Sequence, residues 1–328
     1  MTVLVTGAAG YIGSHVTLSL IEAGHTVVAV DNLCNSDRAA LSAVYELTGT
    51  PIKFYECDVR DGNSLMDVVM ANKVEAVVHL AGLKSVSESV SLPLEYYENN
   101  VGGTLTLLRV MALCGVSRLV FSSSATVYGA APTPTQEDAP TMAATNPYGR
   151  TKLVIEGMIK DAEAAGIVEA TILRYFNPVG SHPSGLLGEN PKGEPANLMP
   201  HICKAAAGFG PLKVFGTDYD TPDGTCMRDY IHVLDLAQGH IAALSRPGTY
   251  NLGGGKPCSV LELIKAFEAA NGVTVPYETA GRRVGDVAES LADITKAKRE
   301  LGWSPKRSPD DMCRDAWRSY LHQKEGDK

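Results

Sequence analysis

Short apolar runs alternate with longer amphipathic segments along the first half of the chain. The apolar runs are rich in β-branched residues and the longer segments have apolar positions at helical spacing, so we expect alternating strands and helices. Most of the runs are apolar at consecutive positions, as in strands that are buried on both faces. The pattern predicts a parallel sheet with helices on both sides, with strands at residues 2–6, 26–30, 52–56, 75–80 and 118–122.

The second half of the chain continues this pattern and then departs from it. Further strands are expected at 169–174 and 248–252, whereas residues 177–200 are crowded with Pro, Gly and Asn and predict a long functional loop region. The remainder predicts a short strand at 212–215 and helices at 197–207, 259–270, 294–301 and 309–320. We therefore expect an α/β protein: a doubly wound parallel sheet of the Rossmann type in residues 1–176, and a smaller C-terminal α/β substrate domain in residues 177–328. Residues 225–255, roughly, are expected to return to the first sheet.

The composition is that of an ordinary globular protein. The 328 residues are enough for about two domains. Hydrophobic types make up 45% and charged types 20%, which excludes a disordered or fibrous protein. Because 29 basic residues stand against 37 acidic ones and no Lys/Arg cluster is long enough to bind a phosphate backbone, we do not expect nucleic acid as a partner.

Cysteine and histidine usage points to a cytoplasmic protein without a metal. The seven cysteines are odd in number, widely spaced and without a CxxC pair, as is usual for free intracellular thiols. The eight histidines form no HExxH motif or Cys/His cluster. The chain shows no signal-like start and no apolar run of about 18 residues, so we expect neither export nor a membrane span.

A glycine-rich turn follows the first predicted strand directly. Gly7 permits a tight turn, Gly10 lets backbone N–H groups approach a pyrophosphate, and Gly13 lets the following helix, expected at 14–23, pack closely on the sheet. The spacing is GxxGxxG, which also occurs in turns with a purely structural role. The turn alone is therefore weak evidence for a dinucleotide site.

An acidic residue at the end of the second predicted strand strengthens that interpretation. Asp31 can accept hydrogen bonds from the two hydroxyls of an adenosine ribose and would repel a 2′-phosphate. Strand, turn, helix, strand and acid in this order predict dinucleotide binding with a preference for NAD over NADP. The alternative is a structural βαβ unit in which Asp31 is coincidental.

Tyr148 and Lys152 are four residues apart and so lie on the same face of a helix expected at 152–165, with Pro147 near its first turn. They follow a serine run, Ser122 to Ser124, which ends a predicted parallel strand, where α/β enzymes place their chemistry. A second pair with this spacing, Tyr320 and Lys324, lies in a polar tail and is interpreted as a solvated helix end.

A free phenol titrates near ~10, so a tyrosine acting as a base near neutral pH needs its pKa lowered by about three units. We expect Lys152 and the positive charge of an oxidised nicotinamide to lower the pKa of Tyr148. Ser124 would hydrogen-bond the substrate hydroxyl or the phenol. The alternative is a helix-face tyrosine packed on a lysine stem, beside serines that merely end a strand.

With these residues in place, the chain resembles the extended short-chain dehydrogenase/reductase family, most closely its UDP-hexose 4-epimerases. The resemblance covers nearly the whole length. It rests on the segments VTGAAGYIGSH, DNLCNS, HLAGLKSVSESV, PLEYYENNVGGT, FSSSATVYG, NPYGRTK, RYFNPVGSHPSG, NLMP and DGTCMRDYIHVLDLA. It implies an enzyme that interconverts UDP-glucose and UDP-galactose with tightly bound NAD. Tyr148 would take the C4 hydroxyl proton while C4 passes hydride to NAD⁺, and the resulting 4-keto sugar would turn over before the hydride returns.

The resemblance also implies binding residues. The implied NAD contacts are Gly7, Gly10, Tyr11, Ile12, Gly13, Asp31, Asn32, Asn35, Ser36, Asp58, Val59, Leu80, Ala81, Gly82, Lys84, Asn99, Ser122, Tyr148, Lys152 and Tyr175. The implied nucleotide-sugar contacts are Lys84, Ser124, Tyr148, Asn177, Asn197, Leu198, Phe215, Arg228, Arg283, Asp286 and Ser290. Arginine suits a diphosphate and phenylalanine can stack on uracil. Each arginine alone could equally form a surface ion pair.

Two departures from the family bear on the substrate. Ala125 and Thr126 stand where sugar-nucleotide dehydratases of the family carry Asp and Glu, so dehydration would lack its acid and base. Ser290 stands where many bacterial epimerases of the family carry a tyrosine, four residues after the aspartate of the 283–286 segment. We hypothesise that the smaller side chain leaves room for a 2-acetamido group, so that UDP-GlcNAc and UDP-GalNAc are also interconverted. Alternatively, neighbouring side chains refill the space.

The family further implies a homodimer, formed by the helices at 94–114 and 148–165 across a two-fold axis. Two other functions stay open at this point. One is a different nucleotide-sugar oxidoreductase of the family, such as a reductase or a decarboxylase. The other is a catalytically silent NAD-binding regulator.

Overall fold

A computed structural model describes residues 1–141, 144–193, 195–283 and 286–326 of the chain. In these residues seven parallel strands form one sheet in the order β10-β6-β5-β4-β1-β2-β3. The strands are β1 (Thr2–Thr6), β2 (Thr26–Asp31), β3 (Lys53–Glu56), β4 (Ala76–His79), β5 (Arg118–Ser124), β6 (Glu169–Tyr175) and β10 (Gly248–Leu252). The predicted α/β class and doubly wound sheet are confirmed.

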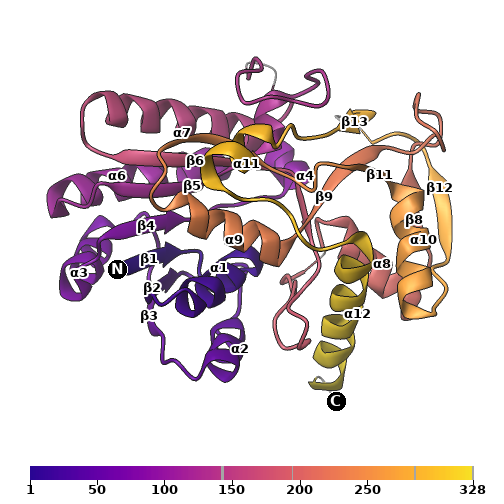
Figure 1. The fold of residues 1–328 in the computed structure, drawn as a ribbon, viewed down its shortest axis with the longest axis horizontal. Helices are drawn as coiled ribbons and strands as arrows, with labels where there is room; N and C mark the ends of the chain where they lie inside the picture. Colours follow the sequence, from indigo (N-terminus) through magenta and orange to yellow (C-terminus); the bar gives the residue numbers. More distant parts are fainter. Residues whose placement is uncertain (142–143, 194, 284–285, 327–328) are drawn as a thin grey trace.

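Helices cover both faces of this sheet (Figure 1). One layer contains α1 (Tyr11–Glu22), α2 (Ala39–Thr48) and α9 (Val233–Ala243), and the other contains α3 (Gly62–Asn72), α6 (Gly103–Cys114) and α7 (Pro147–Ala164). Neighbouring positions of a strand face opposite layers: Val3 and Val5 pack with α1, whereas Leu4 packs with α3 and α6. This explains why the strands are apolar at consecutive positions.

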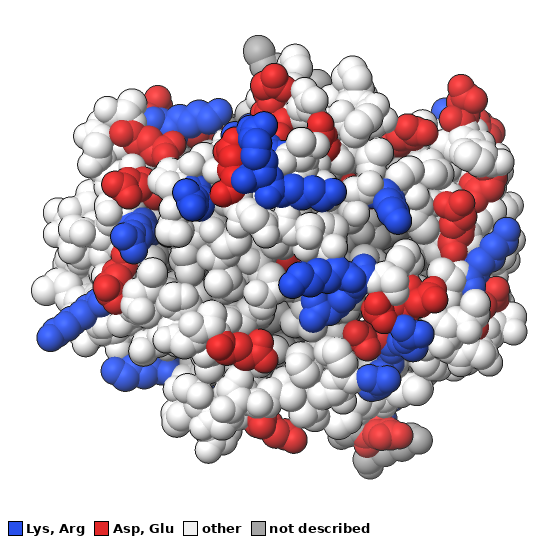
Figure 2. Space-filling view, in the orientation of Figure 1, with Lys and Arg blue, Asp and Glu red and all other residues white. Residues whose placement is uncertain are grey.

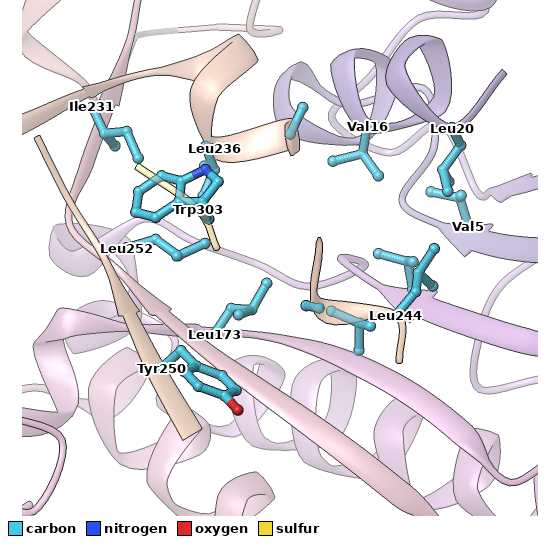
Figure 3. Packing of buried hydrophobic residues seen from close by; sticks show 14 of the residues in the cluster. Val5, Val16, Leu20, Leu173, Ile231, Leu236, Leu244, Tyr250, Leu252 and Trp303 are labelled. Atoms are coloured by element: carbon cyan, nitrogen blue, oxygen red, sulfur yellow. The ribbon is translucent and has the colours of Figure 1, made fainter. Parts of the chain in front are cut away.

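The core extends to the last strand of the sheet. Trp303, which follows α11 (Thr295–Leu301), packs beside Leu236 of α9 and Leu252 of β10 (Figure 3). Its indole N–H donates to the backbone oxygen of Asp235 at 2.9 Å. Segments near the end of the chain therefore complete the core that contains α1 and α9. The boundary between the two expected domains stays a prediction.

The smaller lobe lies at the other end of the molecule (Figure 1). One sheet of this lobe has β9 (Met227–His232) paired with β7 (Asn177–Val179), β11 (Pro257–Ser259) and β13 (Glu289–Ser290). Another sheet of the lobe pairs β8 (Leu212–Phe215) with β12 (Tyr277–Ala280). These sheets pack with α8 (Leu198–Ala206), α10 (Val260–Asn271) and α12 (Pro309–Gly326) around a third core. On the face shown in Figure 2, acidic and basic side chains are interspersed.

Three expectations for local structure were wrong. The helix after the glycine turn begins at Tyr11 rather than Ser14, because Gly10 occupies its N-cap. The segment 94–114 is divided into α5 (Pro93–Tyr96), the π-helical η1 (Tyr97–Gly102) and α6, preceded by α4 (Val86–Ser91). The expected loop 177–200 opens with a strand, β7, because that segment pairs with β9.

The order of the strands creates a crevice. From β1 the chain runs to β2 and β3 on one side, and from β4 to β5, β6 and β10 on the other. Their crossovers therefore diverge between the carboxyl ends of β1 and β4, where open α/β sheets bind ligands.

Candidate active site

The glycine turn closes against the first sheet by contacts that only glycine allows. Gly7 has φ +71°, and a Cβ there would lie 2.7 Å from the backbone nitrogen of Ala81 after β4. A Cβ at Gly13 would lie 1.9 Å from the carbonyl oxygen of Gly7. Gly10 opens α1 without a side chain. The free N–H groups at the start of α1 therefore face an open space, as an anion site requires.

Asp31 connects this turn with the loop after β2. Its Oδ2 accepts from the backbone N–H of Ala9 at 3.0 Å, and its Oδ1 accepts from the N–H of Leu33 at 2.9 Å and from the Ser36 hydroxyl at 2.8 Å. The carboxylate is buried and lies at the mouth of the crevice. The negative charge of Asp31 would disfavour a 2′-phosphate on an adenosine ribose that binds beside it.

The crevice is a pocket of about 360 Å³. The predicted NAD-binding residues that line it are Gly7, Gly10, Tyr11, Ile12, Gly13, Asp31, Asn32, Asn35, Ser36, Val59, Leu80, Ala81, Gly82, Lys84, Asn99, Ser122, Tyr148, Lys152 and Tyr175. Asp58 is not among the lining residues. It accepts hydrogen bonds from Asn32 and Arg60, and the guanidinium of Arg60 keeps the pKa of this carboxyl well below its usual range.

Tyr148 and Lys152 lie at the inner end of this pocket, on α7. Pro147 occupies the first turn of the helix, and the Asn146 side chain caps it by accepting from Gly149 at 2.9 Å. Lys152 Nζ donates to the carbonyl oxygen of Ser122 at 2.7 Å and lies 5.9 Å from the centre of the Tyr148 ring. Ser124, at the end of β5, is a neighbour of the Tyr148 phenol, and its hydroxyl oxygen accepts from the Thr126 hydroxyl at 3.0 Å. The structure thus brings the three predicted catalytic residues together.

In the chain without a bound nucleotide, burial sets the direction of the pKa shifts of this group, and the expected effect of an oxidised nicotinamide stays a prediction. Burial raises the pKa of Tyr148 to about 12, and the hydrogen bond with Ser124 opposes that rise. Burial lowers the pKa of Lys152 to about 8, and Glu156 opposes that fall. The expected lowering of the phenol pKa is therefore absent from the chain by itself, because removing the phenolate from water outweighs the effect of its neighbours.

A second cluster carries the residues predicted to hold a nucleotide diphosphate. Arg228 on β9 donates to the backbone oxygen of Val287 at 2.9 Å and lies 3.5 Å from an Asp286 carboxylate oxygen. The guanidinium of Arg283 stacks 4.8 Å from the centre of the Phe215 ring and also contacts Asp286. Ser290 on β13 lies opposite Arg228 in the parallel pairing. Val284 and Gly285, between these residues, lie outside the described part of the chain.

A third group joins the two lobes and includes a residue that sequence reasoning missed. Glu189 accepts hydrogen bonds from Lys84 Nζ at 3.2 Å and from the Asn197 side chain at 2.6 Å. It lines the pocket together with residues 186–191 and Gln323. The sequence had indicated only that this loop is functional. Of the other predicted contacts, Asn177 begins β7 and is exposed, and Leu198 begins α8 and is half-buried.

Two further properties concern ions and membranes. Within the described residues, no three or more His, Cys, Asp or Glu side chains are grouped as metal ligands would be. No helix in that part of the chain combines the length and hydropathy that crossing a bilayer requires. All seven cysteines are free thiols.

Sequence comparisons identify the family. A model described as the NAD dependent epimerase/dehydratase family matches residues 3–253. The chain is 52% identical to the UDP-glucose 4-epimerase of Bacillus subtilis, over 97% of this chain and 96% of that protein. It is 50% identical to the UDP-glucose 4-epimerase of Neisseria gonorrhoeae, over 97% of each chain.

Solved structures agree with this. UDP-glucose 4-epimerase from Bifidobacterium longum in complex with NAD⁺ and UDP is 48% identical and matches with a TM-score of 0.96, over 99% of this chain and 100% of that one. UDP-glucose-4-epimerase from Stenotrophomonas maltophila with bound NAD and formylated UDP-arabinopyranose is 49% identical, with a TM-score of 0.97 over 99% of each chain. The chain therefore belongs to the NAD dependent epimerase/dehydratase family, and the predicted resemblance is confirmed.

We expect Gly13→Ala to abolish tight dinucleotide binding, because its Cβ would force the Gly7 carbonyl out of the turn. A matched control is Gly157→Ala on α7, where a Cβ meets nothing within 4 Å. Protein-bound nucleotide released on denaturation and quantified by chromatography measures the effect. The Gly13→Ala protein should retain less than about a tenth of the nucleotide bound by the wild type. A loss of this size corresponds to more than ~1.4 kcal/mol of binding free energy. Equal content in the two variants would contradict the role assigned to the turn.

Proposed function

We propose that this member of the NAD dependent epimerase/dehydratase family is a 4-epimerase that interconverts UDP-glucose and UDP-galactose. The observation that carries the proposal is that Tyr148 and Lys152 line the same pocket as the glycine turn and Asp31, with Ser124 next to the Tyr148 phenol. The name shared by the relatives supports the choice of substrate. The second cluster, around Arg228, supports it because it offers arginines for a diphosphate.

The pocket fits NAD on the chemistry of its donors. The turn would hold the pyrophosphate on the N–H groups of α1, and Asp31 would accept from the adenosine ribose. Lys152 and Tyr175 line the inner end, where the Tyr175 hydroxyl hydrogen-bonds Ser122. Bound there, NAD would take a hydride from the sugar C4 and return it to the opposite face, so the carbon is inverted without net oxidation.

Tyr148 would move the proton that accompanies this change. Its phenol is fully protonated near neutral pH in the chain itself, because burial raises its pKa to about 12. It can therefore donate a proton to a sugar oxygen, and it can accept one only when a nearby positive charge stabilises the phenolate. Lys152 supplies part of that charge, and the oxidised nicotinamide would supply the rest. Ser124 holds the phenol oxygen in place for the transfer.

The second cluster would bind the uridine diphosphate. Arg228 donates to two backbone carbonyl oxygens, those of Met227 and Val287, each at 2.9 Å. These bonds fix the orientation of its guanidinium, so its other N–H groups could bind the diphosphate without further loss of side-chain freedom. Arg283 is half-exposed and covers Phe215, a ring on which uracil can stack. Asn177, Asn197 and Leu198 would complete the contacts to the nucleotide sugar.

Dehydration of the same substrates is disfavoured by the residues after β5. Ala125 and Thr126 begin the 3-10 helix η2 (Ala125–Tyr128). Neither side chain can serve as the acid or the base that removal of water needs.

We also place the protein in the cytoplasm, because seven free thiols suit a reducing compartment.

Purified protein incubated with UDP-galactose and no added cofactor should produce UDP-glucose, measured by chromatography of the two sugars. Tyr148→Phe should lower kcat by about 10³-fold, within the usual range for loss of a general acid–base group. Tyr45→Phe, which changes an exposed phenol on α2, should have no effect. Net NADH or CO₂ release from a UDP-sugar would favour a different oxidoreductase. An active Tyr148→Phe protein would contradict the assigned proton transfer.

For Ser290, we propose that its small side chain admits a 2-acetamido group. Wild-type protein should interconvert UDP-GlcNAc and UDP-GalNAc, and Ser290→Tyr should lower that activity more than about tenfold, since lost space in a filled pocket is worth ~1–3 kcal/mol. Ser290→Tyr should leave UDP-galactose turnover within a few-fold of wild type, and Ser290→Ala should retain both activities. Absence of N-acetyl activity in the wild type would remove the idea.

We further propose a homodimer formed by the helices of residues 94–114 and 148–165, which are α5, η1 and α6 in the first segment and α7 in the second. These helices pack on one another and expose large apolar side chains, with Leu94 78% exposed and Leu113 77% exposed. Exposed large apolar side chains on these helices are candidates for an interaction surface.

Analytical ultracentrifugation should give the wild type twice its 34.8 kDa chain mass. Leu94→Glu combined with Leu105→Glu should give the single-chain mass, because buried unpaired carboxylates oppose association. Met70→Glu, at an equally apolar exposed site on α3, should stay dimeric. A wild-type protein that sediments as one chain would exclude the dimer.

A further inference from the structure

Three buried polar residues form a row on the inner face of α7. Tyr148, Lys152 and Glu156 follow one another at four-residue spacing, with exposed fractions of 8%, 5% and 1%. Residues four apart lie one above another on a helix. The proposed function uses the first two members of this row and leaves the third, a buried carboxylate, without a role.

Two members of the row hydrogen-bond consecutive serines at the end of β5. Lys152 Nζ donates to the carbonyl oxygen of Ser122 at 2.7 Å. The hydroxyl of the next residue, Ser123, donates to Glu156 Oε1 at 2.5 Å. The inner face of α7 is therefore bonded to β5 at two successive positions, once through a main-chain oxygen and once through the Glu156 carboxylate.

Arg174 on the neighbouring strand β6 completes the carboxylate's bonds. Its Nε donates to Glu156 Oε1 at 2.9 Å and its Nη2 to Oε2 at 2.6 Å, a two-pronged geometry that fixes the carboxylate plane. The same guanidinium donates to the Tyr128 hydroxyl at 3.0 Å and to the Glu137 backbone oxygen at 2.9 Å. Glu156 is thus hydrogen-bonded to both β5 and β6. It therefore restrains α7 relative to these two strands.

The groups that face Lys152 define its electrostatic environment. On α7 these are Tyr148 and Glu156, on β6 the phenol Tyr175, and on β4 His79, whose pKa burial lowers to about 3 so that it is neutral. The Lys152 ammonium also lies 4.9 Å from the centre of the Phe121 ring. Burial works against the ammonium, and the charge of Glu156 works for it.

We propose that Glu156 is a positioning residue of the epimerase site: through Ser123 and Arg174 it fixes α7 against the end of β5, and it places a carboxylate one helical turn from the Lys152 ammonium. The proposal rests on the proposed function for its catalytic consequence. Its electrostatic consequence is a property of the chain alone. Neutralising the carboxylate should therefore release Lys152's proton at lower pH.

Glu156→Gln tests this, with two readouts on the purified protein as isolated. In ¹³C-lysine NMR, with the resonance assigned by a Lys152→Met protein, the pKa of Lys152 should fall by about one unit or more, the usual effect of one close charge. The descending alkaline limb of the kcat profile for UDP-galactose should move to lower pH by the same amount. Asp161→Asn removes an equal charge from an exposed position on the same helix and should move neither readout.

Two variants separate charge from position and guard against misfolding. Glu156→Asp keeps the charge but shortens the side chain, so Lys152 should titrate near its wild-type pKa while kcat falls. Because Glu156→Gln leaves Arg174 buried without its partner, Glu156→Gln with Arg174→Gln removes both charges together. This double variant should fold as the wild type does by circular dichroism and still show the lowered Lys152 pKa.

Lys152 titrating as in the wild type, in either folded variant that lacks the carboxylate, would overturn the proposal. A wild-type protein that fails to convert UDP-galactose would instead overturn the proposed function, and the NMR titration would still decide the role of Glu156. Lowered kcat with an unshifted alkaline limb would reduce Glu156 to a purely structural residue and would also count against the proposal.

Discussion

Removal of a phenol and an ammonium from water governs the chemistry of this site. Tyr148 and Lys152 are both buried, and burial moves their pKa values apart: that of the phenol rises to about 12 and that of the ammonium falls to about 8. Desolvation disfavours the charged form of each group, so the chain alone favours the neutral pair more than either free side chain would. The resting site therefore favours a protonated phenol. Its proposed use as a base would depend on a positive charge that arrives with the ligand.

The fold makes that dependence possible by bringing two binding regions to one edge of the sheet. The glycine turn after β1 and the serine run at the end of β5 lie on either side of the point where the strand order reverses. The smaller lobe adds Glu189, which contacts both Lys84 and Asn197. Tyr11, at the start of α1, also donates to the Gly180 backbone oxygen of that lobe at 2.6 Å. A ligand that spans the pocket is thus contacted from both lobes.

The sequence predicted the large sheet well because its central strands, such as β1 and β4, are buried on both faces and apolar at consecutive positions. It missed β9, which carries Arg228 and Asp229. The buried Asp229 carboxylate accepts from the backbone N–H groups of Gly254, Gly255 and Ala292, which are distant in sequence and invisible to local patterns. The same limit applies at the site. Residue spacing placed Tyr148 beside Lys152, but the direction of their pKa shifts is set by burial, which only the folded chain shows.

The central claim is that positive charge brought by the oxidised cofactor makes Tyr148 a base. Ultraviolet difference titration of the wild type against Tyr148→Phe, in the NAD⁺ and NADH forms, measures this directly through the absorbance of the tyrosinate. The account predicts a Tyr148 pKa several units lower in the NAD⁺ form than in the NADH form. The same pKa near 12 in both forms would contradict it.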